Sequence, residues 1–266
     1  MLNTEKRNEN STHIDKMTTG EMLKVIQNEN LNAALAVEKA LPQITVAVDE
    51  ISSRINRGGR LFYVGCGTSG RLGVLDASEC PPTYGVSPDM VVGIISGGEK
   101  ALRNAVEGVE DNFEAGMRDI SKYNLTELDS VVGISVAGGA AYVLGALSAA
   151  KNANALTVGL TCNEDCKINE FADLFILTDT GAEVVTGSTR MKAGTAHKMV
   201  LNMLSTCVMI KYGRVLENYM IYIKPMNVKL KDRMICIVSE IANISREEAE
   251  EKLNSSDWDI KKAIEN

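Results

Sequence analysis

One stretch of this chain constrains its fold more than any other. The apolar residues 61–64 (LFYV) are followed by GCGTSG at 65–70, and then by a helical pattern that stops at Pro81 and Pro82. The apolar run predicts a buried strand, and the glycines allow a tight turn into a helix whose first N–H groups point at an anion. The hydroxyls of this turn suit a terminal phosphate. The stretch therefore predicts a site for a small phosphorylated molecule, contacted by Gly67, Thr68, Ser69 and Gly70.

Apolar runs and helical patterns alternate through the middle of the chain. Such alternation predicts an α/β fold in which helices cover both faces of a parallel sheet, giving three layers. Ligands of such sheets bind at the carboxyl ends of the strands, where glycine-rich loops follow the first and third strands. Strands are expected at 61–64, 90–95, 130–136, 156–161 and 174–177, and helices at 69–78, 100–106, 111–123, 142–152 and 188–212.

The chain divides by composition into three segments. Residues 1–57 predict a polar arm and two helical stretches, 19–30 and 31–57, with a kink at Pro42. Residues 58–227 carry the alternating strands and helices, and form the expected sugar-phosphate-binding domain. Residues 228–266 are more charged, and the capping-box pattern SREE at 245–248 predicts a short helix there. We expect this last segment to form a small helical, UBA-like module.

Net charge, apolar runs and the cysteine and histidine content limit which partners, ligands and compartment we expect for this protein. The net charge of −7 argues against general nucleic-acid binding, which needs a basic face. No apolar run reaches the length of a membrane span, and no polybasic run would hold a membrane surface. The six cysteines follow a polar N-terminus without a secretory signal, so we expect reduced thiols in the cytoplasm. With two histidines far apart in the sequence, no metal site is expected.

A second segment, residues 181–195, also favours an anion. Ser188 and Thr189 are expected to open a long helix, with Arg190 and Lys192 in its first turn. Cations at a helix start oppose the helix dipole, which is expected where an anion binds. These four residues are therefore candidate ligands of the substrate. Two alternatives remain: simple surface charge, or pairing of Glu183 with one of the two cations.

One acidic position is a candidate for proton transfer, and a second acidic segment precedes a helix. Glu79 precedes the two prolines, which would hold its carboxylate rigidly. A helix from residue 69 to 79 is about 15 Å long, so Glu79 would act on a distant carbon of the ligand or in a neighbouring subunit. Glu110 and Asp111 lie in a glycine-containing loop before a helix. One alternative is that the Glu79 side chain is simply solvated. The other is that the acids before the helix only stabilise its N-terminus, which is the default interpretation of Asp111.

The glycines at 65, 67 and 70 also match the fingerprint of a dinucleotide site. That site would need an acidic residue after the second strand to bind a ribose, and Glu99 occupies such a position. The hydroxyl pair at 68–69 fits a phosphomonoester better, and a tight turn without a ligand is the remaining alternative.

Together these motifs resemble the N-acetylmuramic acid 6-phosphate etherase family, whose fold is a sugar-isomerase (SIS) domain. The resemblance covers nearly the whole chain, and the vertebrate glucokinase regulatory protein is a related non-enzymatic branch. The matching motifs are TEKRN at 4–8, GTSGRLGVLDASECPPT at 67–83, AVEGVED at 105–111, TGSTRMKAGT at 186–195 and LNMLST at 201–206.

The resemblance implies a carbon–oxygen lyase of cell-wall amino-sugar recycling. Such an enzyme removes D-lactate from C3 of the phosphorylated amino sugar and leaves N-acetylglucosamine 6-phosphate. The family's two glutamates correspond to Glu79, as the proton donor, and Glu110, as the second acid–base residue. No metal or redox cofactor is implied, because the open-chain aldehyde acidifies C2. Homodimers with sites near the subunit interface are also implied.

One loop departs from the family pattern. After the third strand the family usually reads ASGRTPY, whereas residues 136–142 of this chain read VAGGAAY. In this fold that loop helps to hold the sugar phosphate, and here its hydroxyls and guanidinium are absent. The departure keeps open a non-catalytic sugar-phosphate-binding regulator. An aldose–ketose isomerase of the same fold is a further alternative, because it shares the proton abstraction at C2.

Overall fold

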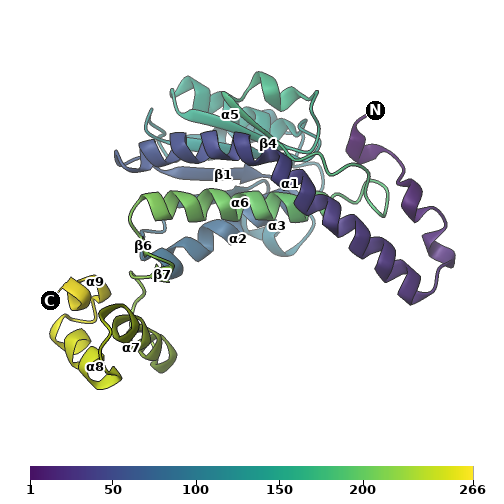
Figure 1. Ribbon diagram of the computed structural model, residues 1–266. Coiled ribbons are helices and arrows are strands. Elements are labelled where there is room, and N and C mark those ends of the chain that lie inside the picture. Colours follow the sequence, from purple (N-terminus) through teal and green to yellow (C-terminus); the bar gives the residue numbers. More distant parts are fainter. Residues whose placement is uncertain (266) are drawn as a thin grey trace.

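The computed structural model describes residues 1–265 and is built around a five-stranded parallel sheet (Figure 1). The strand order is β2-β1-β3-β4-β5. The expected parallel sheet and its five strands are confirmed, with shifts of one or two residues at some ends. The strands are β1 (Leu61–Gly65), β2 (Val91–Ile95), β3 (Ser130–Ile134), β4 (Leu156–Thr161) and β5 (Leu174–Leu177).

Helices cover both faces of the sheet, which accounts for its apolar strands. Leu61 and Tyr63 of β1 pack in one cluster with α1, α2 and α6, whereas Phe62 and Val64 pack in another with α4 and α5. This alternation is the two-residue period of a strand buried on both faces. The helices are α1 (Thr19–Ile55), α2 (Gly67–Tyr84), α3 (Gly98–Arg103), α4 (Phe113–Ser121), α5 (Ala141–Asn152) and α6 (Lys192–Lys211).

Helix α2 is longer than the sequence pattern predicts. It continues through Pro81 and Pro82 to Tyr84, so the expected stop at the prolines is wrong. Both prolines fall in the last turn, where each lacks the N–H that would donate to a carbonyl one turn earlier, so the helix loses two hydrogen bonds. Cys80 and Tyr84 are buried in the core, and this packing offsets the loss. The helix ends at Gly85, whose left-handed conformation (φ +63°) closes it.

Two further expectations about helices are corrected. The two helical stretches before residue 57 form one helix, α1, which includes Pro42. Helix α6 begins at Lys192 rather than at residue 188. Ser188, Thr189 and Arg190 therefore lie in the turn before the helix.

The strand order places the expected loops side by side. From β1 the chain crosses to β2 on one side, and from β3 it crosses to β4 on the other. β1 and β3 are neighbours, so the loops after them open a crevice between them. Crevices at such switch points are the usual ligand sites of open α/β sheets.

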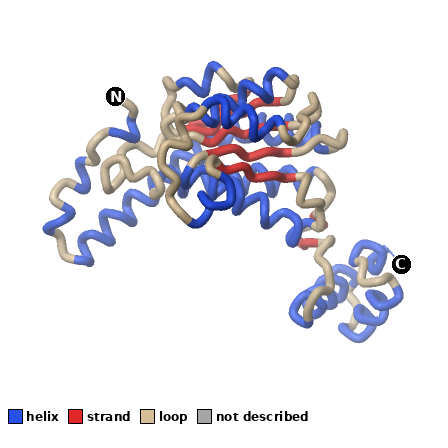
Figure 2. Tube along the Cα trace, turned by 180° about the vertical axis from the view of Figure 1, so that it is seen from behind, coloured by secondary structure: helices blue, strands red, loops and turns tan. Residues whose placement is uncertain are grey.

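The last part of the chain has its own small core (Figure 2). Its helices are α7 (Val228–Ala242), α8 (Arg246–Ser255) and α9 (Ile260–Glu265), and the expected capping box at Ser245 and Glu248 is confirmed. Ile221 and Ile223 pack in the same cluster. A short hairpin, β6 (Val215–Leu216) with β7 (Tyr219–Met220), precedes them. The boundaries at 57/58 and 227/228 stay predictions.

A helix needs about 20 predominantly apolar residues to cross a bilayer. Within residues 1–265, none is long and apolar enough to cross a membrane.

Candidate active site

A cavity of about 390 Å³ lies in the crevice at the carboxyl ends of β1 and β3. Four segments line it: the β1–α2 turn, the loop before α4, the β3–α5 loop and the approach to α6. The lining residues are Cys66, Gly67, Thr68, Ser69, Glu110, Asp111, Ile134, Ser135, Val136, Ala137, Gly139, Ala140, Thr189 and Gly194. The sequence predicted the position of this cavity.

The β1–α2 turn brings the start of a helix to the cavity. Gly67 adopts a positive φ of +52°, and helix α2 starts there. The first N–H groups of a helix lie outside its hydrogen-bond ladder and can bind an anion. Thr68 and Ser69 line the cavity as expected. Gly70 is outside the lining that the described residues form, and a Cβ there would lie 2.5 Å from the carbonyl oxygen of Gly65, so its contact with a ligand stays a prediction.

The β3–α5 loop forms the opposite wall. Gly138 has a φ of +68°, and a Cβ at this position would lie 2.3 Å from Sγ of Cys166. The N–H of Gly138 donates to the Ser135 carbonyl at 2.9 Å, and the N–H of Ala140 donates to Ser135 Oγ at 3.4 Å. The loop is therefore shaped by its main chain and by Ser135, and Ala137, Gly139 and Ala140 line the cavity without a polar side chain.

Glu110 is the candidate acid–base residue that the structure brings to this cavity. Its carbonyl oxygen accepts the N–H of Tyr142 at 2.9 Å, which ties its loop to α5. Ser96 Oγ supports the same loop by donating to the Val109 carbonyl at 2.8 Å. Asp111, expected to favour the following helix, lines the cavity as well. No pattern in the sequence indicates that both acids would face one cavity.

Cys66 stays a neutral thiol beside these carboxylates. Burial raises the pKa of its thiol to about 12, and the charges of Glu110 and Asp111 act in the same direction. A thiolate nucleophile is therefore disfavoured at this position.

Glu79 lies elsewhere in the subunit. Its exposed side chain lines a second cavity of about 170 Å³ between α2 and α6, together with Lys198 and Asn202. The helix rises about 18 Å from Gly67 to Glu79, at about 1.5 Å per residue. A single subunit therefore does not bring Glu79 and Glu110 to one site.

The segment before α6 contributes less than the sequence predicts. Thr189 lines the large cavity, whereas Ser188 and the exposed Arg190 are outside the lining that the described residues form. Glu183 accepts the N–H groups of Lys192 at 3.1 Å and Ala193 at 3.0 Å, so a carboxylate already occupies the start of α6. This pairing differs from the expected contact of Glu183 with a cationic side chain.

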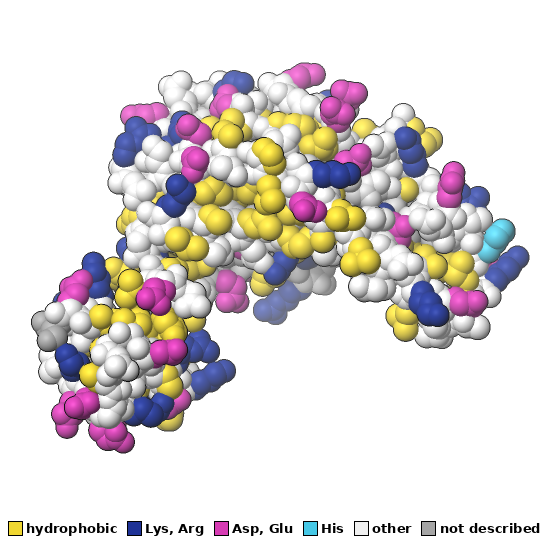
Figure 3. All heavy atoms as spheres, viewed as in Figure 1, with side chains coloured by type: hydrophobic (Ala, Val, Ile, Leu, Met, Phe, Trp, Pro, Cys, Tyr) yellow, Lys and Arg dark blue, Asp and Glu magenta, His cyan; other side chains and the backbone are white. Residues whose placement is uncertain are grey.

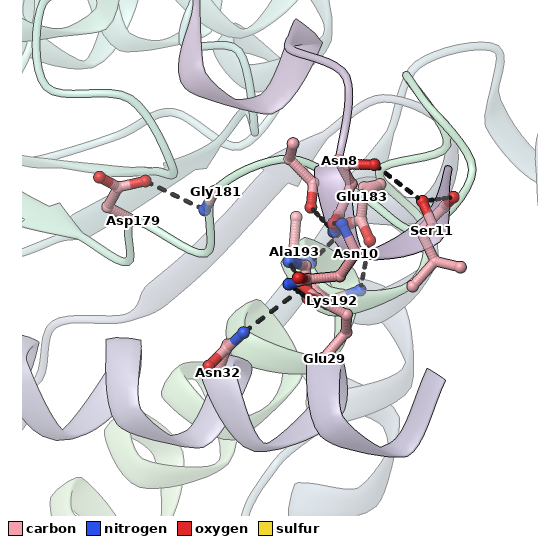
Figure 4. A network of polar contacts seen from close by, with 12 residues as sticks. Asn8, Asn10, Ser11, Glu29, Asn32, Asp179, Gly181, Glu183, Lys192 and Ala193 are labelled. Carbon is pink, nitrogen blue, oxygen red and sulfur yellow. Dashed lines mark hydrogen bonds and ion pairs between the residues drawn. The ribbon is translucent and has the colours of Figure 1, made fainter. Parts of the chain in front are cut away.

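Lys192 forms a buried ion pair with Glu29 of α1 (Figure 4). Both side chains are almost completely buried. Burial raises the pKa of Glu29, but hydrogen bonds from Lys192 and Asn10 outweigh it and leave the pKa below its ordinary value. Substrate contact by Lys192 stays a prediction, and this pair argues against it because the ammonium group already has a buried carboxylate partner.

The N-terminal arm fixes the same segment, a role that sequence reasoning missed. Asn8 Nδ2 donates to the Ala182 carbonyl at 2.9 Å, and Ser11 Oγ donates to the Val184 carbonyl at 2.7 Å. Asn10 Nδ2 donates to Glu29 at 2.9 Å. Isolated polar residues in an arm follow no periodic pattern, so the sequence does not indicate their distant hydrogen-bond partners.

The fold and the cavity define the class of SIS, or sugar-isomerase, domains. The family profile of the glucokinase regulatory protein N-terminal SIS domain matches residues 43–151. A phosphoheptose isomerase from Neisseria gonorrhoeae has the same fold, with a TM-score of 0.55 and 18% identity over 72% of this chain and 98% of that one.

Closer relatives then identify the family. N-acetylmuramic acid 6-phosphate etherases from Caldanaerobacter subterraneus subsp. tengcongensis and Clostridium beijerinckii are 51% and 52% identical to this chain. Each alignment covers 99% of this chain and 86% of the relative. The chain belongs to the N-acetylmuramic acid 6-phosphate etherase family, which confirms the resemblance read from its motifs.

Proposed function

We propose that this protein cleaves the D-lactyl ether of N-acetylmuramic acid 6-phosphate, giving N-acetylglucosamine 6-phosphate and D-lactate. One observation carries the proposal: Glu110 faces a cavity flanked by two helix starts, in a chain half identical to relatives named as this etherase. We place the reaction in the cytoplasm. All six cysteines lie in the described residues as free thiols, as is usual in a reducing compartment.

The proposed reaction is an elimination followed by a hydration. In the open-chain sugar the aldehyde acidifies C2, and Glu110 removes the C2 proton. The electron pair forms the C2–C3 double bond as the C3–O bond breaks, and Glu79 protonates the departing lactyl oxygen. Water then adds at C3 and a proton returns to C2. The aldehyde takes up the developing charge, so the proposal assigns no metal or redox cofactor.

We propose a homodimer in which each site combines Glu110 of one subunit with Glu79 of the partner subunit. The rise of about 18 Å along α2, from the helix start at the Glu110 cavity to Glu79, supports this arrangement. So does an apolar surface over α1 and α6 (Figure 3), since contiguous exposed apolar side chains often mark an interface. Its exposed side chains on these helices are Leu23, Leu31, Leu35, Leu41, Val46 and Ile210.

Product analysis in labelled water tests the chemistry. Incubation with N-acetylmuramic acid 6-phosphate in H2(18)O should release unlabelled D-lactate and put the label on the sugar, because solvent oxygen enters at C3. Glu110→Gln should abolish lactate release while keeping the fold, as checked by circular dichroism. Label in the lactate would contradict the elimination, and no lactate from the native protein at high concentration would contradict the activity.

A second candidate function is that of a sugar-phosphate-binding regulator without turnover. The β3–α5 loop favours it, because Ala137, Gly139 and Ala140 offer the cavity no side-chain donor. Titration calorimetry with N-acetylglucosamine 6-phosphate, beside the lactate assay, separates the two. Binding without turnover supports a regulator, and efficient turnover rules it out.

A further inference from the structure

Glu79 lies in a small cavity between α2 and α6 whose other walls combine apolar, amide and charged side chains. The volume of this cavity is about 170 Å³. Its lining residues besides Glu79 are Leu72, Leu75, Asp76, Lys198, Leu201 and Asn202. Among the lining residues of the described chain, Lys198 is the one cation. The candidate proton donor thus shares its cavity with a group that attracts anions.

Helix α6 presents an amide beside this cation. Lys198 and Asn202 are four residues apart and therefore lie on one face of the helix. Asn202 Nδ2 donates to Oδ1 of the buried Asp76 at 2.6 Å, and Ser205 Oγ donates to the same oxygen at 3.2 Å. Asp76 Oδ2 has no hydrogen-bond partner within residues 1–265, which is rare for a buried polar atom unless water or a ligand joins it.

The ammonium group of Lys198 is available for a ligand. The side chain is exposed and takes part in none of the ion pairs formed within residues 1–265. Arg71 of α2 is engaged elsewhere, since it donates to the carbonyls of Leu102 and Asn104, each at 3.1 Å. Glu79 carries a proton when it meets the ether oxygen in the proposed reaction, so it does not repel an anion there.

The leaving group of the proposed reaction carries such an anion. The carbon that holds the ether oxygen in the D-lactyl group also holds a methyl group and a carboxylate. Glu79 must reach the ether oxygen to protonate it, so both substituents lie close to Glu79 at that moment. The apolar side chains of Leu72 and Leu75 suit the methyl group, and Lys198 suits the carboxylate.

We infer that the cavity between α2 and α6 is the subsite for the lactyl group, where Lys198 pairs with the lactyl carboxylate and selects ethers that carry this charge. The inference rests on the proposed function and assigns it a specificity residue. The carboxylate is charged both in the bound substrate and in the transition state. Loss of the Lys198 charge should therefore raise KM more than it lowers kcat.

The experiment compares N-acetylmuramic acid 6-phosphate with its lactyl amide, in which an uncharged carboxamide replaces the carboxylate. Release of N-acetylglucosamine 6-phosphate measures both reactions. Native protein should prefer the acid about tenfold or more in kcat/KM. Lys198→Met should lose this preference through a higher KM for the acid, and Lys198→Arg should retain much of it. Lys151→Met, at an exposed lysine of α5, serves as the matched control and should behave as native protein.

Two kinetic results would overturn the inference. One is native protein that uses the acid and the amide equally well. The other is a Lys198→Met variant that keeps the native preference for the acid.

A binding measurement keeps the inference testable if native protein turns over neither ether, an outcome that would sink the proposed function alone. Ligand-observed NMR with D-lactate and D-lactamide probes the subsite without the sugar. Binding of D-lactate to native protein and to Lys151→Met, with loss in Lys198→Met, supports the inference. Equal binding of D-lactate to all three proteins, or binding to none, overturns it.

Discussion

His197 is fully buried in α6 and contacts the thiol of Cys162, with 3.4 Å between Nε2 and Sγ. Burial lowers the pKa of this imidazole from 6.5 to about 4. Between pH 6.5 and about 4, the folded protein therefore keeps His197 neutral, whereas the unfolded chain protonates it. Single buried groups of this kind make stability depend on pH.

We expect His197 to weaken the fold as the medium is acidified. Above pH 6.5 the imidazole is neutral in both states, whereas between about pH 6.5 and 4 the unfolded state alone is protonated. Over that interval His197 should remove about 3 kcal/mol from the free energy of unfolding, at about 1.4 kcal/mol per pKa unit. Urea denaturation at several pH values measures it. His197→Asn should flatten the dependence by this amount, and an unchanged slope would contradict the assignment.

Breaking the Glu29–Lys192 pair should be costly, because either single substitution leaves a buried charge unpaired. Glu29→Gln and Lys192→Met should each lower the free energy of unfolding by about 3–5 kcal/mol. The double variant Glu29→Leu/Lys192→Met should recover most of that loss, since apolar side chains can replace a buried ion pair. Denaturation curves of the three variants measure this, and additive losses in the double variant would argue against direct coupling.

At the scale of elements, the conformation of the β3–α5 loop depends more on Gly138 than on Gly139. Gly138 needs its positive φ and its closeness to Cys166, whereas Gly139 has neither constraint. Since the loop forms one wall of the cavity, its conformation decides where the N–H groups of the α5 start lie.

Alanine at these two positions should therefore act differently. Gly138→Ala should lower the free energy of unfolding by about 1–3 kcal/mol or more, through backbone strain and the contact with Sγ of Cys166. Gly139→Ala should stay within about 0.5 kcal/mol of native protein. Differential scanning calorimetry on the matched pair checks both values. Equal melting temperatures would contradict the described loop.

The sequence predicted the elements well where the core alone decides them. The five strands follow from apolar runs that are buried on both faces. Local signals failed where tertiary packing overrides them, as in the last turn of α2, where Pro81 and Pro82 do not end the helix. The start of α6 was missed because Glu183, distant from the helical pattern, supplies the acceptor that caps it.

Much of the candidate site was also predictable. Thr68 and Ser69 line the cavity, since loops after the neighbouring parallel strands β1 and β3 must converge, and Thr189 joins them from the segment between β5 and α6. Glu110 could be named from the family resemblance but not placed, because its loop has no regular pattern. The pairing of Lys192 with Glu29 joins residues 163 positions apart, which no local pattern encodes.

At the scale of the whole molecule, the proposed reaction uses two glutamates that lie far apart in one subunit. Glu110 faces the large cavity, and Glu79 lies about 18 Å along α2 at a second cavity beside the exposed Leu75. A symmetric dimer places the same two residues twice, so each subunit can supply what the other lacks. The apolar surface over α1 and α6 fits burial against a second copy of the chain.

Subunit complementation tests this account most directly. Glu79→Gln and Glu110→Gln chains, co-expressed with different tags and purified through both, give a dimer with one intact site and one doubly substituted site. The account predicts that each variant alone is inactive and that the mixed dimer releases D-lactate at about half the native rate. A mixed dimer as inactive as its parents, beside active native protein, would contradict a site shared between subunits.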